Sequence, residues 1–262
     1  MLLEVLRGLA IPFFGTFFGA AGVFLLGRKV GAEQRARLYR TMIAFAAGVM
    51  TAASVWSLLI PSTEQAAGAG MGRLSFLPPT AGFTCGALLF LLLERWTQKL
   101  RPAEDGRGER SFRQTTMLIV AVVLHNIPEG IALGIVYAGL IAGEVSSAAA
   151  LVLSVGIAIQ NVPDGAIISL PLAAKGMPRG RAFAAGVASG VVEPLAALVT
   201  FALSGLILPA MPLLLSFAAG AMVYVVVDDL FPEISTDGGT TLGTIAFMLG
   251  FALMMMLDIA LG

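Results

Sequence analysis

Two short polar runs interrupt otherwise apolar stretches of the chain, and their side chains are suited to binding a cation. Residues 125–130 read H-N-I-P-E-G and residues 160–165 read Q-N-V-P-D-G, so the second run begins 35 positions after the first. Each run combines an imidazole or amide, an asparagine and a carboxylic acid, all of which are groups that bind divalent metals. Ionisable groups at bilayer depth are costly and rare, so their repetition indicates a site that holds or moves a cation inside a membrane.

The spacing within each run predicts one ligand-bearing face on each of two helices. His125 and Glu129 are four residues apart, as are Gln160 and Asp164, so each pair lies on one helical face. If the two helices face each other, six side chains form a compact cage, in which both carboxylates have oxygens enough to bridge two ions. The six are His125, Asn126, Glu129, Gln160, Asn161 and Asp164. The cage has no thiolate, which suits a site that must release its ion.

Glu193 is a seventh candidate, because it lies several residues inside an apolar stretch and is followed by Pro194. Two interpretations stay open for it. As a ligand it adds a third carboxylate, which would partly balance the charge of one or two divalent ions. As a structural residue it is a neutral, hydrogen-bonded acid that fixes helix packing.

Composition places these candidates in a membrane. The chain is 58% hydrophobic and 12% charged, with a mean hydropathy of +0.91, whereas soluble domains carry about 25% charged residues. Eight stretches are long and apolar enough to span a bilayer, which predicts an all-α polytopic membrane protein with eight transmembrane helices. They are residues 3–26, 41–61, 76–96, 116–140, 147–173, 182–207, 212–232 and 241–261.

Basic residues gather between spans one and two, three and four, and five and six, and only Arg7 and Arg73 lie on the opposite side. Positively charged loops stay cytoplasmic, so both termini are predicted to be extracytoplasmic, in the plasma (inner) membrane. The whole chain, residues 1–262, is predicted to be one transmembrane domain with a polar cytoplasmic linker over residues 98–114. Zero formal net charge gives no sign of nucleic-acid binding.

The chain contains an internal resemblance between its two ends. Residues 45–50 read F-A-A-G-V-M and residues 217–222 read F-A-A-G-A-M, in spans that run in opposite directions. Spans three and eight likewise share a glycine followed by an acid eight positions later. Chance likeness among Ala- and Gly-rich helices is the alternative. We predict an inverted repeat of three helices, a central pair and three helices (3+2+3), an arrangement typical of secondary transporters.

The paired runs, the eight spans and the outward termini resemble the ZIP (Zrt/Irt-like) family of divalent-metal transporters. The Gln-Asn opening of the second run and the Glu193–Pro194 pair resemble its GufA-like branch. The resemblance implies a transporter rather than an enzyme, with no resident cofactor and with zinc as the leading substrate, moved toward the cytoplasm. Iron, manganese, cadmium and cobalt are further candidate substrates.

The resemblance also implies a binuclear site bridged by Glu129 and Asp164. One ion would be held by His125, Glu129, Gln160 and Asp164, and the second by Asn126, Asn161 and Glu193. Two departures from the family stand out. Asp164 replaces the usual glutamate, which questions its bridging role, and residues 98–114 lack the usual histidine run.

Further polar residues form a predicted transport pathway. By resemblance, Met50, Ser57 and Glu64 line its outer half, although Met50 also suits simple packing and Glu64 a solvated helix end. Acids at the inner end of span seven either form a metal exit or neutralise the basic loops. These are Asp228, Asp229 and Glu233.

Other classes of membrane protein fit less well. The chain has one histidine and therefore no H-E-x-x-H protease motif, and it has no phosphate-binding loop for an ATP-driven pump. A divalent-cation-selective channel remains the alternative to a carrier. A monomer and a homodimer are both left open.

Overall fold

The computed structural model describes residues 2–25, 31–99, 126–174, 176–235 and 241–261, and every regular element within them is a helix. In this part of the chain, seven helices are long and apolar enough to cross a membrane, and a shorter apolar helix covers Asn126–Ala142. The protein is therefore an integral membrane protein with several spans. Seven of the eight predicted stretches overlap one of these spans, and the fourth, residues 116–140, overlaps the shorter helix, with its residues 116–125 outside the described part. His125 and residues 100–114 of the predicted linker lie outside the described residues.

The described part of the chain consists of helical elements and the segments that connect them. In chain order they are α1 (Leu2–Leu25), α2 (Ala32–Ala53), η1 (Ser54–Leu59), α3 (Ile60–Gly68), η2 (Gly72–Leu74), α4 (Leu77–Lys99), the helix Asn126–Ala142, α6 (Ser147–Ala174), α7 (Arg179–Ser189), α8 (Val192–Ala202), α9 (Ser204–Ile207), η3 (Leu208–Ala210), α10 (Met211–Val225), η4 (Val226–Leu230), α11 (Phe231–Ser235) and α12 (Thr241–Leu261).

Two spans contain a wider, π-helical turn at matching places. The turn η1 joins α2 to α3, and η4 joins α10 to α11. In both cases the following helix has proline at its second position, as Pro61 and Pro232. Proline has no N–H to donate to the carbonyl four residues earlier, and a wider turn accommodates that lost bond.

Helices α2 and α12 approach each other through a reciprocal pair of glycines. A Cβ placed on Gly48 would lie 2.0 Å from the carbonyl oxygen of Phe247, and one on Gly250 would lie 2.1 Å from that of Phe45. No side chain fits at such distances, so both positions require glycine. Close backbone approach through small residues is a common way for helices to pack in lipid, where burial of apolar surface contributes little.

Helices α4 and α10 repeat this contact. A Cβ on Gly86 would lie 2.0 Å from the carbonyl oxygen of Phe217, and one on Gly220 would lie 2.0 Å from that of Phe83. The same Phe-x-x-Gly sequence therefore joins both helix pairs.

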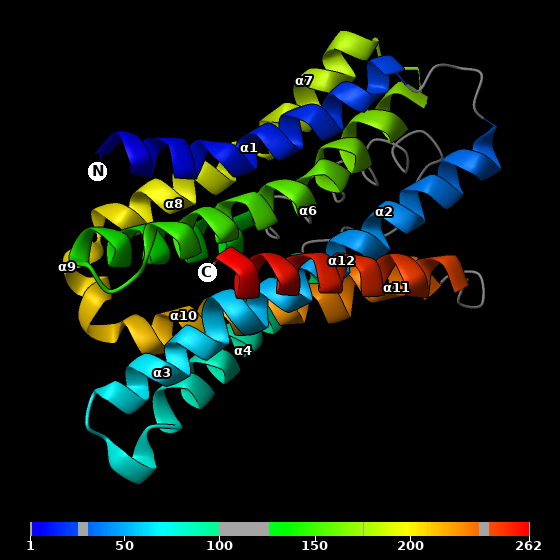
Figure 1. Cartoon of the computed structure of the whole chain (residues 1–262). Coiled ribbons are helices and arrows are strands. Elements are labelled where there is room, and N and C mark those ends of the chain that lie inside the picture. Colours follow the sequence, from blue (N-terminus) through cyan, green and yellow to red (C-terminus); the bar gives the residue numbers. More distant parts are fainter. Residues whose placement is uncertain (1, 26–30, 100–125, 175, 236–240, 262) are drawn as a thin grey trace.

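The remaining spans form a second group built in a similar way. A Cβ on Gly165 of α6 would lie 2.0 Å from the carbonyl oxygen of Thr16 in α1, and one on Gly130 would lie 2.4 Å from that of Glu193 in α8. Figure 1 shows α1, α6, α7 and α8 together on one side of the bundle, and α2, α4, α10 and α12 on the other. Helix α6 contacts both groups, through α2 and α12. The two termini lie toward the same end of the bundle (Figure 1).

Candidate metal site

The described candidate ligands all lie in the group formed by α1, the helix Asn126–Ala142, α6 and α8. Asn126 and Glu129 come from the first turn of their helix, and Glu193 comes from the first turn of α8. The other three, on the central part of α6, are Gln160, Asn161 and Asp164. All six side chains are buried, and the most exposed of them, Asp164, is only 6% exposed. The remaining predicted ligand, His125, lies outside the described residues.

Hydrogen bonds join the two polar runs to each other and to α8. The Gln160 side-chain Nε2 donates to Glu129 Oε1 at 2.5 Å, and the Asn161 side-chain Nδ2 donates to Glu193 Oε2 at 2.6 Å. The first of these bonds joins the two central helices, so they face each other, which is the condition on which the predicted cage depended. Glu193, for which the sequence allowed two interpretations, lies beside the second run.

The two asparagines are held by backbone carbonyls through their amide groups. Asn126 Nδ2 donates to the Ser189 carbonyl at 3.1 Å, and Asn161 Nδ2 also reaches the Pro12 carbonyl at 3.4 Å. These bonds engage the N–H side of each amide. The oxygen side of each remains for another partner.

Several buried acceptor oxygens of the cluster receive no hydrogen bond from the residues that the structure describes. These oxygens are Asn126 Oδ1, Gln160 Oε1, Asn161 Oδ1 and Glu193 Oε1. A buried polar atom without a partner costs about 1–3 kcal/mol. Four such acceptors in one cluster are suited to a cation, which would satisfy them together.

The charge of the cluster also favours a cation. Glu129, Asp164 and Glu193 are buried, while the buried polar residues of the described part include no lysine or arginine. Buried charges are normally paired or bound to metal. No three His, Cys, Asp or Glu side chains within the described ranges form a metal site by themselves, so a site here needs the amide oxygens, or His125, as well.

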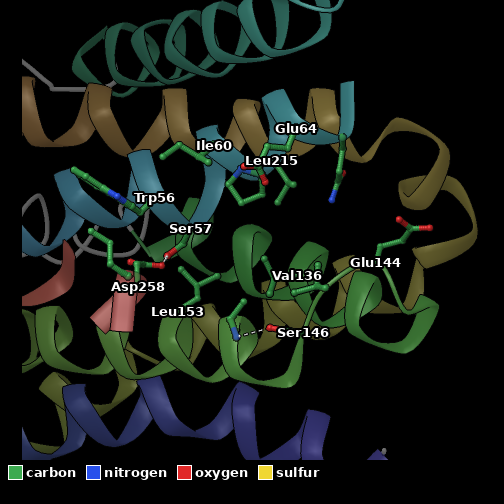
Figure 2. Close-up of a pocket in the computed structure, with 15 residues that line it drawn as sticks. Trp56, Ser57, Ile60, Glu64, Val136, Glu144, Ser146, Leu153, Leu215 and Asp258 are labelled. Atoms are coloured by element: carbon green, nitrogen blue, oxygen red, sulfur yellow. Dashed lines mark hydrogen bonds between the residues drawn. The ribbon is translucent and has the colours of Figure 1, made fainter. Parts of the chain in front are cut away.

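A pocket of about 340 Å³ lies between η1, the first residues of α3, the start of α6 and the last turn of α12. Two of the predicted outer pathway residues, Ser57 and Glu64, line it together with Glu144 and Asp258. Figure 2 shows Ser57 pointing at Asp258, and Ser57 Oγ donates to Asp258 Oδ1 at 2.7 Å. Met50 is fully buried in the hydrophobic core and is not among the residues that line the pocket.

Sequence reasoning missed the contribution of Glu144 and Asp258 to this pocket. Asp258 is the acid of span eight that matches Glu94 of span three in the repeat, and it accepts a bond from Ser57. Its match Glu94 accepts a bond from Tyr224. Glu144 lies in the connection before α6, where local sequence gives no sign of which helices surround it.

The predicted inner acids are only partly described. Asp228 lies in η4 with an exposed side chain. The side chains of Asp229 and Glu233 lie outside the described part of the structure. Their role in an exit path stays a prediction.

Comparison with known proteins agrees with the resemblance in the polar runs. The profile described as ZIP Zinc transporter matches residues 103–258. The zinc transporter ZIPB of Bordetella bronchiseptica is 40% identical over 93% of this chain and 80% of its own length. The zinc transporter ZIP11 of Homo sapiens is 34% identical over 95% of this chain and 96% of its own.

A third relative bears on the predicted branch. The zinc transporter GufA of Myxococcus xanthus is 32% identical over 79% of this chain and 81% of its own length. The similarity to these three relatives covers between 79% and 95% of this chain. The chain belongs to the ZIP family of zinc transporters.

Proposed function

We propose that this protein is a carrier of divalent transition metals, with zinc as its leading substrate, and that it moves metal toward the cytoplasm. The observation that carries the proposal is the cluster on α6, α8 and the helix Asn126–Ala142 of buried carboxylates and of amide oxygens that have no described hydrogen-bond partner. The relatives named as zinc transporters support zinc. Carboxylate and amide oxygens also accept Fe²⁺, Mn²⁺, Cd²⁺ and Co²⁺, so these are further substrates to test.

The proposed site holds two ions. One is bound by His125, Glu129, Gln160 and Asp164 and the other by Asn126, Asn161 and Glu193, with Glu129 and Asp164 as bridges. The hydrogen bonds Gln160 to Glu129 and Asn161 to Glu193 support this division, because each joins members of one proposed set. Three carboxylates leave two divalent ions only partly neutralised, which favours release.

The proposed architecture is an inverted 3+2+3 repeat that places this site between its halves. The repeat relates α2 to α10 and α12 to α4. The contact of α2 with α12 through Phe-x-x-Gly supports the repeat, because α10 and α4 make the same contact. The π-helical turns η1 and η4 also occupy matching places. In the central helices, Asn161 and Asn126 each donate to a backbone carbonyl, of Pro12 and Ser189.

We favour a carrier over the divalent-cation-selective channel. The described ligands belong to one helix group, and the backbones within each group approach too closely to slide apart easily. Alternating access would then come from movement of one group against the other, as inverted repeats permit. Ligands of this number and charge also hold an ion too long for a fast pore.

Both termini are proposed to lie outside the cytoplasm, on the evidence of the basic loops. The pocket lined by Ser57, Glu64 and Asp258 then faces outward and forms the entrance. Its carboxylates would attract cations. At the opposite end, Asp228, Asp229 and Glu233 are proposed to form the exit for the metal. The alternative role for these three acids is to neutralise the basic loops.

Uptake of Zn²⁺ into proteoliposomes containing the purified protein tests the proposal. We expect uptake that saturates at low metal concentration, with slow turnover, and that a panel of other divalent ions inhibits. Flux that rises without saturation and at channel rates would favour the alternative. Absence of any metal-dependent flux, in vesicles shown to contain folded protein, would remove the proposal.

A further inference from the structure

Thr16 on α1 is a fully buried residue whose hydroxyl has no hydrogen-bond partner in the part of the chain that the structure describes. Other helical hydroxyls differ, since those of Thr51 and Ser154 donate to the carbonyl oxygen four residues earlier, at 2.7 Å and 3.0 Å. The corresponding carbonyl for Thr16 is that of Pro12, which receives the Asn161 amide at 3.4 Å. The Thr16 hydroxyl is therefore a buried polar group whose hydrogen-bonding capacity is unused.

Thr16 packs against the backbone that carries the proposed ligands. A Cβ on Gly190 would lie 2.9 Å from Thr16 Oγ1, and one on Gly165 would lie 2.0 Å from the Thr16 carbonyl oxygen. Gly165 directly follows Asp164 in α6, and Gly190 lies three residues before Glu193 at the break between α7 and α8. The hydroxyl thus lies where α1, α6 and α8 meet around the site.

Thr16 and Glu193 occupy corresponding positions in the two halves. The asparagine of the second polar run donates to the carbonyl of Pro12, and that of the first run donates to the carbonyl of Ser189. Four residues after Pro12 comes Thr16, and four residues after Ser189 comes Glu193. One half therefore presents a hydroxyl where the other presents a carboxylate.

Backbone packing gives the same correspondence independently. The Thr16 carbonyl lies against Gly165 of the second run, and the Glu193 carbonyl lies against Gly130 of the first run. Glu193 has one oxygen bonded to Asn161 and its other oxygen, Oε1, without a described hydrogen-bond partner. Both corresponding residues thus have a buried side-chain oxygen without a described hydrogen-bond partner.

We infer that Thr16 Oγ1 is a further oxygen ligand of the cation bound by Asn126, Asn161 and Glu193. The inference rests on the proposed two-ion site and adds to it a ligand from α1. Because the hydroxyl is neutral, it completes the coordination of the second ion without a fourth negative charge. The second ion is therefore held less strongly than a carboxylate would hold it, and it can leave first.

Titration of the purified, full-length protein with Zn²⁺ alone tests this ligand. We expect two binding steps in the wild type, and roughly a tenfold loss in the weaker step for Thr16→Val, with the tighter step unchanged. Thr16→Ser keeps the oxygen and should stay close to wild type. Thr51→Val is the matched control, because its hydroxyl is satisfied within α2, and it should leave both steps unchanged.

A second measurement does not depend on the stability of Thr16→Val. Thr16→Cys places a soft thiolate at the same point, and Cd²⁺ binding should then produce an ultraviolet thiolate-to-metal charge-transfer band. The wild type, whose single cysteine is the exposed Cys85 of α4, is the control and should give no such band.

Different outcomes separate this inference from the proposed function. Two unchanged binding steps in Thr16→Val, or Cd²⁺ binding to Thr16→Cys without the band, would overturn the role of Thr16 and leave the two-ion site standing. A wild type that binds only one ion would overturn both the two-ion site and this ligand.

Discussion

The two helix groups of this protein differ in how many of their buried polar atoms have a described hydrogen-bond partner. In the group of α2, α4, α10 and α12, the fully buried hydroxyls of Ser54, Ser62 and Ser216 each donate to a backbone carbonyl. In the group that carries the site, buried polar atoms without a described hydrogen-bond partner include Thr16 Oγ1, Asn126 Oδ1, Gln160 Oε1, Asn161 Oδ1, Ser169 Oγ and Glu193 Oε1.

This difference indicates that one group has a structural role and the other a functional role. In the first group, these buried hydroxyls are satisfied and the helix backbones are in direct contact through Phe-x-x-Gly. Asp258 Oδ2 of α12 is the exception, a buried atom there without a described hydrogen-bond partner. The second group is also closely packed, yet it keeps unsatisfied oxygens in its interior. Such oxygens are costly in a membrane unless an ion or water completes them, so their concentration in one group points to function there.

The largest expected effect comes from removing a carboxylate from the site group. Glu129→Gln should lower Zn²⁺ uptake by more than about a hundredfold, since even loss of a residue that only supports a ligand costs about 10–100-fold. His125→Ala should do the same. Uptake into proteoliposomes at matched protein amounts is the measurement. Glu33→Gln, at the exposed start of α2, is the control, and near-normal transport by both site variants would rule out this site.

Disrupting the close contact between α2 and α12 should instead lower the stability of the protein. Gly48→Ala places a methyl group 2.0 Å from the Phe247 carbonyl oxygen, and we expect a loss of about 1–3 kcal/mol in the free energy of unfolding. Thermal unfolding in detergent measures it. Gly22→Ala on α1 is the matched control, because no atom lies within 4 Å of its new Cβ. An equal effect of the two substitutions would contradict the role of the close helix contact.

A smaller and opposite effect is expected at Asp164. Asp164→Glu lengthens the proposed bridge by one methylene. It should strengthen binding of the second ion by about 1 kcal/mol, or roughly fivefold in affinity. Anomalous scattering from metal-loaded crystals of both forms provides the occupancy of each ion. Equal occupancy of both ions in the two forms would mean that aspartate bridges as well as glutamate does.

The smallest effect is expected at the outer pocket, which both groups help to line. Asp258→Asn removes one of its charges, and we expect KM for Zn²⁺ to rise by about threefold with little change in maximal rate, because partly exposed charges contribute about 0.2–1 kcal/mol. Initial rates of uptake across zinc concentrations test this. A large fall in maximal rate would place Asp258 in the binding site itself.

The spans, and the polar side chains that share a face of each central helix, could be predicted from sequence because both depend on local patterns. Hydropathy over about 20 residues marks a membrane helix wherever it packs. The four-residue spacing between His125 and Glu129, and between Gln160 and Asp164, determines which side chains share a helical face. The glycine and phenylalanine pattern of the repeat likewise pointed to related helices before their contacts were known.

The tertiary structure decided which helices meet and which oxygens remain unpaired. Phe45 lies against Gly250, and no local property of either segment selects that partner. For the same reason, the position of Glu144 in the outer pocket could not be predicted from the sequence. Thr16 could not be singled out either, since an ordinary helical threonine bonds to its own backbone. Only when Asn161 reaches the Pro12 carbonyl and Gly190 packs against Thr16 does that hydroxyl become available to the site.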